Sequence, residues 1–233
     1  EDGIRDRSPS RGLGDVYKRQ SQECASALVT FNPHPQEIIH SQQKFSHICT
    51  SVHQLRLLEE QGLDEVHIIN FTSELSEMLP EKFALQFLIK RFELVKLVIG
   101  YDFRFGKNRE GDFKLLESLS QQFNFSLEEI DPVQQKGRTV SSSLIRQLLR
   151  EFRFAEIPQY LGREYSIYGI VEKGEQRGNK LGFPTANIYP EVTLVLAPGV
   201  YVSKIKLAKK NYFGITNAGY KPTFGINNFT VET

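Results

Sequence analysis

The chain has 233 residues, of which 39% are hydrophobic and 24% are charged, and its formal net charge is +1. This size predicts one or two domains with a substantial core, and the balanced charge excludes a global field that would draw the chain to nucleic acid or to a membrane surface. No apolar run of about 18 residues occurs, so no transmembrane helix is expected. The two cysteines, Cys24 and Cys49, are too few for a disulfide framework and are expected to be free thiols in a reducing cytosol.

Both ends of the chain have unusual sequences. Residues 1–20 carry no helical or strand periodicity and lack the apolar stretch of a signal peptide. They look like a translated adaptor or assembly scar, so we predict that they are not native; a native disordered tail is the alternative. At the other end, residues 231–233 stop within an expected strand. The chain is therefore expected to be a piece of a longer protein.

The first half, residues 21–162, alternates short apolar runs with helical patterns. Strands are expected at 27–31, 66–71, 95–100 and 125–130, and helices from 51, at 80–92, at 113–123 and at 141–150. This alternation predicts an α/β domain with a mostly parallel sheet.

The second half, residues 163–233, consists of β-rich runs separated by Gly, Pro and Asn. In the run 199–207, Tyr201, Ser203 and Ile205 fall on one face of a strand, and lysines and valines fall on the other. No helical pattern occurs after about residue 160. The pattern predicts an antiparallel barrel or sandwich, with a domain boundary near Gly162.

A glycine-rich stretch in the second half gives the strongest functional signal. Glycines recur at every fourth position and cations lie between them: Gly174, Gly178, Gly182, with Arg177 and Lys180. Glycines let a backbone approach phosphates closely and direct N–H groups toward them, and the cations neutralise phosphate charge. The spacing does not fit a P-loop. The alternative is an ordinary glycine-rich hairpin turn.

Two polar residues follow this stretch directly. Thr185 and Asn187 come after Pro184 and are two positions apart, so on an extended strand they project from the same face. Hydroxyl and amide oxygens on one face suit a hard cation such as Mg2+.

Three polar segments of the first half follow strands or begin a helix. Asn32 and His34 come directly after the strand 27–31, and the basic, glycine-containing loop 100–112, with Asp102, follows the strand 95–100. Ligands of open α/β sheets bind at such carboxyl ends. The alternative is a turn with a solvated His and a surface loop anchored by its two phenylalanines.

The third segment is the start of the helix at 141–150. Ser141 and Ser142 stand at this start between Arg138 and Arg146. The free N–H groups and the helix dipole favour an anion there. The alternative is ordinary N-capping, which accounts for only one serine.

These motifs resemble those of known families. The string Leu181–Asn187 after a glycine-rich basic loop looks like the riboflavin kinase signature, and 217–225 and 231–233 agree with it in order. The segments Phe31–Pro35, Gly100–Gly106 and Ser141–Arg146 resemble the FMN adenylyltransferase module of bacterial bifunctional FAD synthetases. The resemblance implies a nucleotidyltransferase-like domain with a Rossmann-like parallel sheet, followed by an all-β riboflavin-kinase-like antiparallel barrel.

The resemblance also implies roles for particular residues. In the kinase half it makes Glu232 the catalytic base, assigns Mg2+ to Thr185 and Asn187, and gives the nucleotide to Gly174, Gly178, Lys180, Gly182 and Pro184. In the adenylyltransferase half it assigns ATP and the flavin phosphate to Asn32, His34, Asp102, Arg138, Ser141, Ser142 and Arg146. The implied enzyme phosphorylates riboflavin to FMN and adenylylates FMN to FAD in the bacterial cytoplasm, with ATP as co-substrate and without nucleic-acid or membrane partners.

One family motif is missing from the chain. The first nucleotide loop of the adenylyltransferase family, which is expected before the strand 27–31, does not occur. We therefore expect impaired adenylylation by this chain. One alternative is a kinase with a degenerate, regulatory adenylyltransferase half. A second alternative is a nucleic-acid-binding β-barrel, for which the lysines of 204–210 are the only local basic cluster. The sequence gives no oligomeric state.

Overall fold

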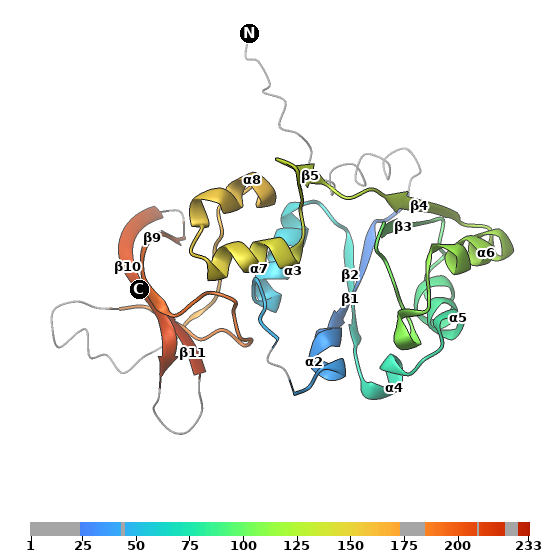
Figure 1. Ribbon diagram of the computed structural model, residues 1–233, viewed down its shortest axis with the longest axis horizontal. Coiled ribbons are helices and arrows are strands. Elements are labelled where there is room, and N and C mark those ends of the chain that lie inside the picture. The colour runs from blue at the N-terminus through green and yellow to red at the C-terminus, as the bar shows by residue number, and fades with distance from the viewer. Residues whose placement is uncertain (1–23, 43–44, 173–184, 209, 222–227) are drawn as a thin grey trace, which may run out of the picture. The chain divides into compact units, whose positions relative to one another are not determined.

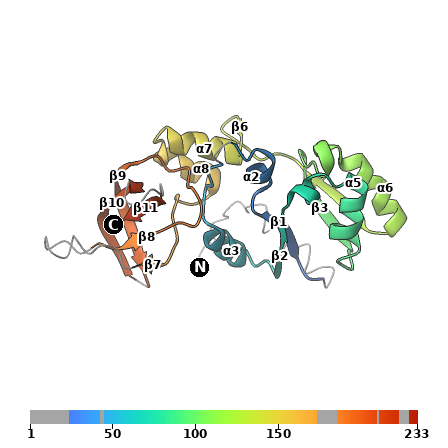
Figure 2. The same ribbon diagram turned by 90° about the horizontal axis from the view of Figure 1, so that it is seen from below.

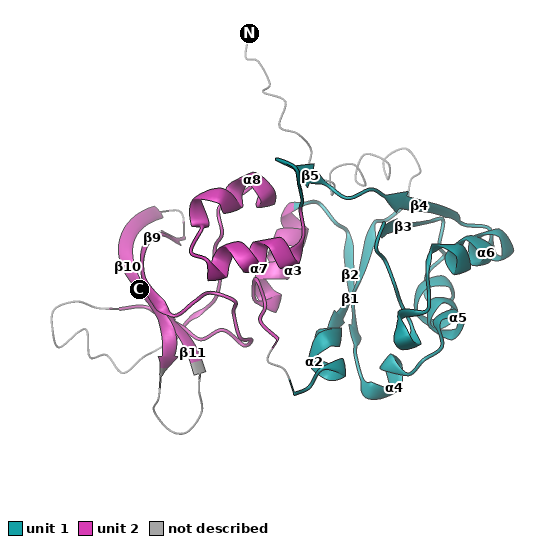
Figure 3. Cartoon of the chain, viewed as in Figure 1, with its two compact units in different colours: residues 1–44, 61–139 teal, residues 45–60, 140–233 magenta. Residues whose placement is uncertain are grey.

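The computed structural model describes residues 24–42, 45–172, 185–208, 210–221 and 228–233. The chain divides into two compact units, which Figure 3 colours separately: residues 1–44 with 61–139, and residues 45–60 with 140–233. Residues 1–20 and the glycine-rich loop 174–182 lie outside the described residues. The predicted domain boundary near Gly162 stays a prediction.

Two parallel strand pairs form the framework of the first unit (Figure 1). β1 (Ala27–Asn32) pairs with β2 (Glu65–Asn70), and β3 (Lys96–Gly100) pairs with β4 (Ser126–Ile130). The parallel pairing predicted for this half is confirmed in both pairs. β5 (Gln134–Gln135) and β6 (Arg138–Thr139) add a short antiparallel hairpin.

Short helices connect these strands. They are α2 (Pro35–Ile39), α4 (Ser73–Ser76), α5 (Pro80–Phe83), the π-helix η1 (Ala84–Ile89), the 3-10 helix η2 (Lys107–Arg109) and α6 (Phe113–Phe123). The helix expected at 80–92 begins at Pro80, but from Ala84 it is a π-helix that ends at Ile89. A π turn inserts one extra residue, and here both Leu88 and Ile89 are buried.

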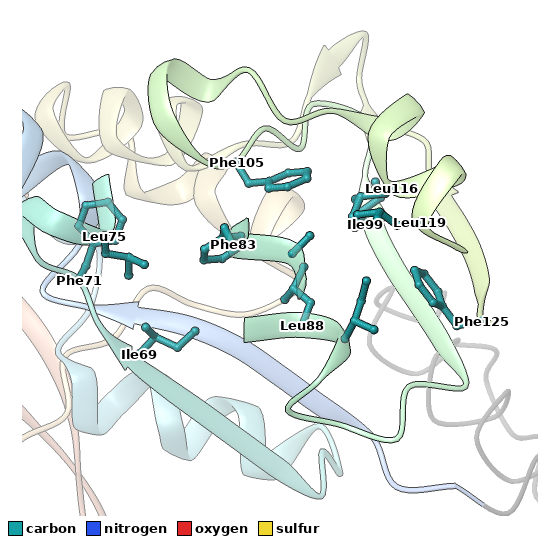
Figure 4. Close-up of a cluster of buried hydrophobic side chains, with 12 residues drawn as sticks. Ile69, Phe71, Leu75, Phe83, Leu88, Ile99, Phe105, Leu116, Leu119 and Phe125 are labelled. Carbon is teal, nitrogen blue, oxygen red and sulfur yellow. The ribbon is translucent and has the colours of Figure 1, made fainter. Parts of the chain in front are cut away.

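The core of the first unit gathers aromatic and aliphatic side chains from these helices and strands (Figure 4). Phe31 of β1 meets Phe71 edge-to-face at 5.3 Å between ring centroids, and Phe83 of α5 lies 6.1 Å from Phe31. Leu116 of α6 is fully buried. Each such side chain stabilises the fold by roughly 1.5–3 kcal/mol through the apolar surface that it removes from water.

The helices of the second unit are α3 (Ser51–Glu60), α7 (Ser142–Arg150), the 3-10 helix η3 (Phe154–Glu156) and α8 (Ile157–Leu161). Leu148 and Leu149 of α7 are fully buried against Ile157 of α8. α8 ends at Gly162, which has a φ of 70° and so adopts a left-handed conformation that suits glycine.

The second unit also contains an antiparallel sheet with the strand order β7-β8-β11-β10-β9, and Figure 2 shows these strands side by side. The strands are β7 (Val171–Glu172), β8 (Asn187–Ile188), β9 (Gly199–Leu207), β10 (Lys210–Lys221) and β11 (Asn228–Glu232). The predicted antiparallel sheet is confirmed. The described strands form an open sheet and not the predicted closed barrel, because β7 and β9 each pair on one side only within the described residues.

No helix in the described ranges is both long enough and apolar enough to cross a membrane.

Candidate active site

The central strand β11 brings the predicted kinase residues together. Glu232 lies directly opposite Asn187 of β8 on one side and Asn217 of β10 on the other. Asn187 in turn lies opposite Glu172 of β7. Because residues directly opposite each other in antiparallel strands project from the same face, these four polar residues form one row across the sheet.

Thr185 completes the cluster from the segment before β8. Its hydroxyl Oγ1 donates a hydrogen bond of 2.7 Å to Oε1 of Glu232. The backbones are also joined there, since Ala186 N–H donates to Thr233 C=O at 2.7 Å and Thr233 N–H donates to Ala186 C=O at 2.9 Å. Thr185, Asn187 and Glu232 therefore meet at one place in the sheet.

The opposite face of the same strands is apolar and buried. Val231 lies opposite Ile188 and Ala218, and all three belong to the core cluster that also contains Phe229. Val231 is 5% exposed and Ala218 is 1% exposed. This alternation fixes the register, because a shift by one residue would bury Glu232 and expose Val231.

The cluster differs in burial from residue to residue. Asn187 is buried, Glu232 is half-buried and Thr185 is exposed. The cluster offers three oxygen ligands to a metal ion: a hydroxyl, an amide oxygen and a carboxylate. Mg2+ is bound by such oxygen ligands in proteins. A threonine hydroxyl can offer a lone pair to a cation while its proton stays in the hydrogen bond to a carboxylate. The residues present therefore fit the expected cation.

The structure does not describe the predicted nucleotide-binding residues of the kinase half. Gly174, Gly178, Lys180, Gly182 and Pro184 all lie outside the described residues.

In the first unit, Asn32 and His34 lie at the carboxyl end of β1. Asn32 is opposite Asn70, the last residue of β2. His34 is the N-cap of α2: its Nδ1 accepts a hydrogen bond from Gln36 N–H at 3.2 Å, and Glu37 Oε1 accepts one from His34 N–H at 3.2 Å. Helix capping is thus one role of His34 in this structure.

Asp102 is exposed and follows β3, in a loop that is tied to its surroundings. Phe105 is buried, and its backbone bonds to Gly111 in both directions. Two of the cations in the loop pair with carboxylates: Arg104 with Asp112 at 3.3 Å and Lys107 with Glu77 at 2.6 Å. The aromatic anchoring given as the alternative is therefore present, and a phosphate contact of this loop stays a prediction.

Ser141 and Arg146 of the second unit both have structural partners. Ser141 is the N-cap of α7, and its Oγ accepts a hydrogen bond from Leu144 N–H at 3.2 Å. Arg146 Nε donates to Ser46 C=O at 3.0 Å, and its guanidinium lies 4.8 Å from the centroid of the Phe45 ring. Burial, with a smaller contribution from Arg150, lowers the pKa of Arg146.

The predicted adenylyltransferase residues are divided between the two units. Asn32, His34, Asp102 and Arg138 belong to the first unit, and Ser141, Ser142 and Arg146 belong to the second. That they form one site stays a prediction.

The sequence did not indicate Glu172, and it gave Asn217 only as part of a motif without a role. Their place in the row depends on strand pairing between distant segments. The regular alternation of the strands was the only local signal, and it predicts a face but not a partner.

Comparison with known proteins identifies both halves of the chain. The family model described as FAD synthetase matches residues 14–144, and the one described as riboflavin kinase matches residues 161–233. The first match begins inside the segment 1–20, whose foreign origin stays a prediction.

Curated relatives match across both halves. The bifunctional riboflavin kinase/FMN adenylyltransferase of Buchnera aphidicola subsp. Schizaphis graminum is 33% identical over 91% of this chain and 69% of its own length. The protein of the same name from Escherichia coli K12 is 31% identical over 84% of this chain. This chain spans 69% of the first relative and 63% of the second.

A solved structure named macrolide-efflux protein, from Streptococcus pneumoniae, has a TM-score of 0.73 and 24% sequence identity, and the match covers 95% of this chain and 73% of that one. At this identity the likeness shows the fold alone. Because one model matches more than half of the chain and relatives match across both halves, the chain belongs to the family of bifunctional riboflavin kinases/FMN adenylyltransferases, enzymes of flavin cofactor biosynthesis.

Proposed function

We propose that the second unit phosphorylates riboflavin with ATP. The γ-phosphoryl group moves to the primary 5′-hydroxyl of the ribityl chain, which gives FMN and ADP. The observation that carries this proposal is the hydrogen bond between Thr185 and Glu232, with Asn187 directly opposite Glu232. Phosphoryl transfer depends mainly on positioning and charge neutralisation, and this cluster supplies a proton acceptor beside two neutral oxygen ligands.

Glu232 acts as the general base. Its carboxylate accepts the proton of the 5′-hydroxyl while the hydroxyl oxygen bonds to the γ-phosphorus, and the bond from that phosphorus to the bridging oxygen of ADP breaks. The hydrogen bond from Thr185 holds one carboxylate oxygen, Oε1, in a fixed direction. In this arrangement Oε2 is the oxygen that takes the proton.

Thr185 and Asn187 would hold Mg2+ through their hydroxyl and amide oxygens. Bound there, Mg2+ would supply positive charge that offsets the negative charge of the ATP phosphates. Asn187 is 3% exposed, so little of its surface is open to water in the absence of ligands. We assign the nucleotide phosphates to Gly174, Gly178, Lys180, Gly182 and Pro184 because the family match covers them.

For the matched residues 14–144, which include the start of α7, we propose adenylylation of FMN. A phosphate oxygen of FMN bonds to the α-phosphorus of ATP, and pyrophosphate leaves. The match to the FAD synthetase model supports this proposal, and so does the place of Asn32 at the end of β1 and of Asp102 after β3. His34, Arg138, Ser141, Ser142 and Arg146 are its other proposed ligand contacts.

An assay with both substrates tests the proposals. The chain is incubated with riboflavin, ATP and Mg2+, and separately with FMN, ATP and Mg2+, and the flavins are separated by chromatography. FMN is the expected product, together with FAD at the reduced rate that the sequence predicts. FMN without FAD supports the kinase-only alternative, and the absence of both products refutes both activities. The family match does not favour a nucleic-acid-binding barrel.

We propose the bacterial cytoplasm as the location, since Cys24 and Cys49 are both free thiols, as expected in a reducing compartment. Riboflavin, FMN and ATP are the proposed partners.

A further inference from the structure

The Glu232 carboxylate has neighbours on two sides, and the proposed mechanism uses only one of them. On the β8 side, Thr185 donates to Oε1. The backbone after Glu232 is also fixed, because Thr233 exchanges two hydrogen bonds with Ala186 and its Oγ1 accepts one of 2.6 Å from Thr216 Oγ1. A base that is fixed so firmly on one side needs a defined position on its other side as well.

The register of β10 places one polar side chain on that other side. Asn217 lies directly opposite Glu232, so their Cβ atoms are about 5 Å apart and project from the same face. The residues of β10 two positions away on this face are Ile215 and Gly219, neither of which has a polar side chain. Among the described residues of β10, Asn217 is therefore the one polar side chain that is adjacent to the carboxylate.

The chemistry of Asn217 suits this position. Its amide NH2 has two protons to donate, whereas an ionised carboxylate only accepts. Asn217 is exposed, so its side chain is not held in the core for packing. On the far side of Asn217 the register places Val200, which offers no polar group that competes for the amide.

We infer that Asn217 is a positioning residue for Glu232. Its side-chain amide is placed to donate to the carboxylate from the β10 side, so that Thr185 and Asn217 together set the direction in which the carboxylate faces the riboflavin hydroxyl. Asn217 contacts neither substrate in this assignment. The inference rests on the proposed kinase function.

The first test is a double-mutant cycle on the kinase reaction of the whole chain. Asn217→Ala lowers kcat by about 10-fold to 100-fold, the usual effect of losing a hydrogen bond to a charged group, and leaves KM for riboflavin and for Mg-ATP within about 2-fold. In a Glu232→Gln background the same substitution changes kcat by less than about 2-fold, because the carboxylate that it positions is gone. Equal effects of Asn217→Ala in both backgrounds overturn the inference.

Two further variants separate donation from packing. Asn217→Asp keeps the size of the side chain but replaces the donor with a negative charge, so it lowers kcat at least as much as Asn217→Ala. Wild-type kcat in Asn217→Asp overturns the inference.

Asn211→Ala is the matched control. Asn211 is exposed and lies on the same strand and face as Asn217. It is opposite Lys206 and about 20 Å from Asn217 along the strand. It keeps wild-type kcat.

A second measurement does not depend on activity. In NMR spectra of the 15N-labelled chain, the side-chain amide signals of Asn217 shift when Glu232→Gln is introduced, and those of Asn211 do not. Unchanged Asn217 signals overturn the inference. If the wild-type chain makes no FMN, the proposed kinase function fails, and this spectrum alone decides whether Asn217 donates to Glu232.

Discussion

The Thr185 hydroxyl donates a 2.7 Å hydrogen bond to the Glu232 carboxylate across 47 positions of sequence. This contact joins the segment before β8 to the last residue of β11. It places the Glu232 carboxylate, which can accept a proton, next to the Thr185 hydroxyl oxygen, which can bind a cation. The relationship therefore gives one physical basis for both proposed roles, base and metal ligand.

Replacing the proposed base tests the first role. Glu232→Gln keeps the size of the side chain and its acceptor oxygen toward Thr185 but removes the capacity to take a proton. We expect kcat for riboflavin phosphorylation to fall by about 10²–10⁴-fold, with a small change in KM. Steady-state kinetics with varied riboflavin measure both constants.

Glu172→Gln is the matched control for this prediction. Glu172 lies in the same row but on β7, two strands from Glu232 and about 10 Å away. We expect wild-type kcat in this variant. Near-normal turnover of Glu232→Gln would remove Glu232 from the mechanism.

Replacing the proposed metal ligand tests the second role. Thr185→Val keeps the shape of the side chain but removes the hydroxyl oxygen. We expect the KM for Mg-ATP to rise by roughly 10-fold, whereas the affinity for riboflavin changes little. Thr185→Ser keeps the hydroxyl and should stay close to wild type. Thr185 is exposed, so neither variant leaves a cavity in the core. An equal loss of Mg-ATP and riboflavin binding in Thr185→Val would indicate a general structural defect instead.

The buried His53 predicts a loss of stability in acid. His53 of α3 is 5% exposed, its Nδ1 accepts no hydrogen bond within the described part of the chain, and burial, with a smaller effect of Arg163, lowers its pKa below 6.5. His53 therefore binds a proton more weakly in the folded state than in the unfolded state. The stability is fully present above about pH 6.5 and decreases as the pH falls from there toward the lowered pKa.

Melting curves between pH 8 and pH 5 check this prediction. Below pH 6.5 the melting temperature of the His53→Phe variant should decrease less than that of the wild type. The reason is that a phenylalanine side chain cannot bind a proton. His40→Gln serves as the control, because His40 is exposed. Identical pH profiles for wild type and His53→Phe would show that His53 does not contribute.

Two glycines with similar positive φ angles differ in the space around them. Gly62 has a φ of 74° and open space where an added Cβ would lie, whereas at Gly106, with a φ of 69°, a Cβ would lie 2.5 Å from the Cα of Pro80. Gly62→Ala should cost about 1 kcal/mol from the left-handed conformation alone. Gly106→Ala should cost about 1–3 kcal/mol more, from the clash with the backbone of Pro80 and from a ψ of −176° that side chains rarely adopt at this φ. Urea unfolding of both variants measures the difference, and equal costs would contradict the crowding.

Local pattern was sufficient for most of the elements. The strands at 27–31, 66–71 and 95–100 and the helix at 113–123 lie where the sequence places them, because apolar periodicity and breaking residues act over short distances. The helix expected at 80–92 was partly wrong, because a π turn has no periodicity signal of its own. Ser141 is the N-cap of α7, and its predicted contact with a phosphate stays a prediction.

By itself, the sequence determined the order of the elements, the change from α/β to β character and the family motifs that contain Thr185, Asn187 and Glu232. Only the tertiary structure decided that these three residues meet, and that Asn217 lies beside them. The physical reason is that strand pairing between distant segments is set by the burial of Val231, Ala218 and Ile188 on the opposite face, which no local pattern encodes.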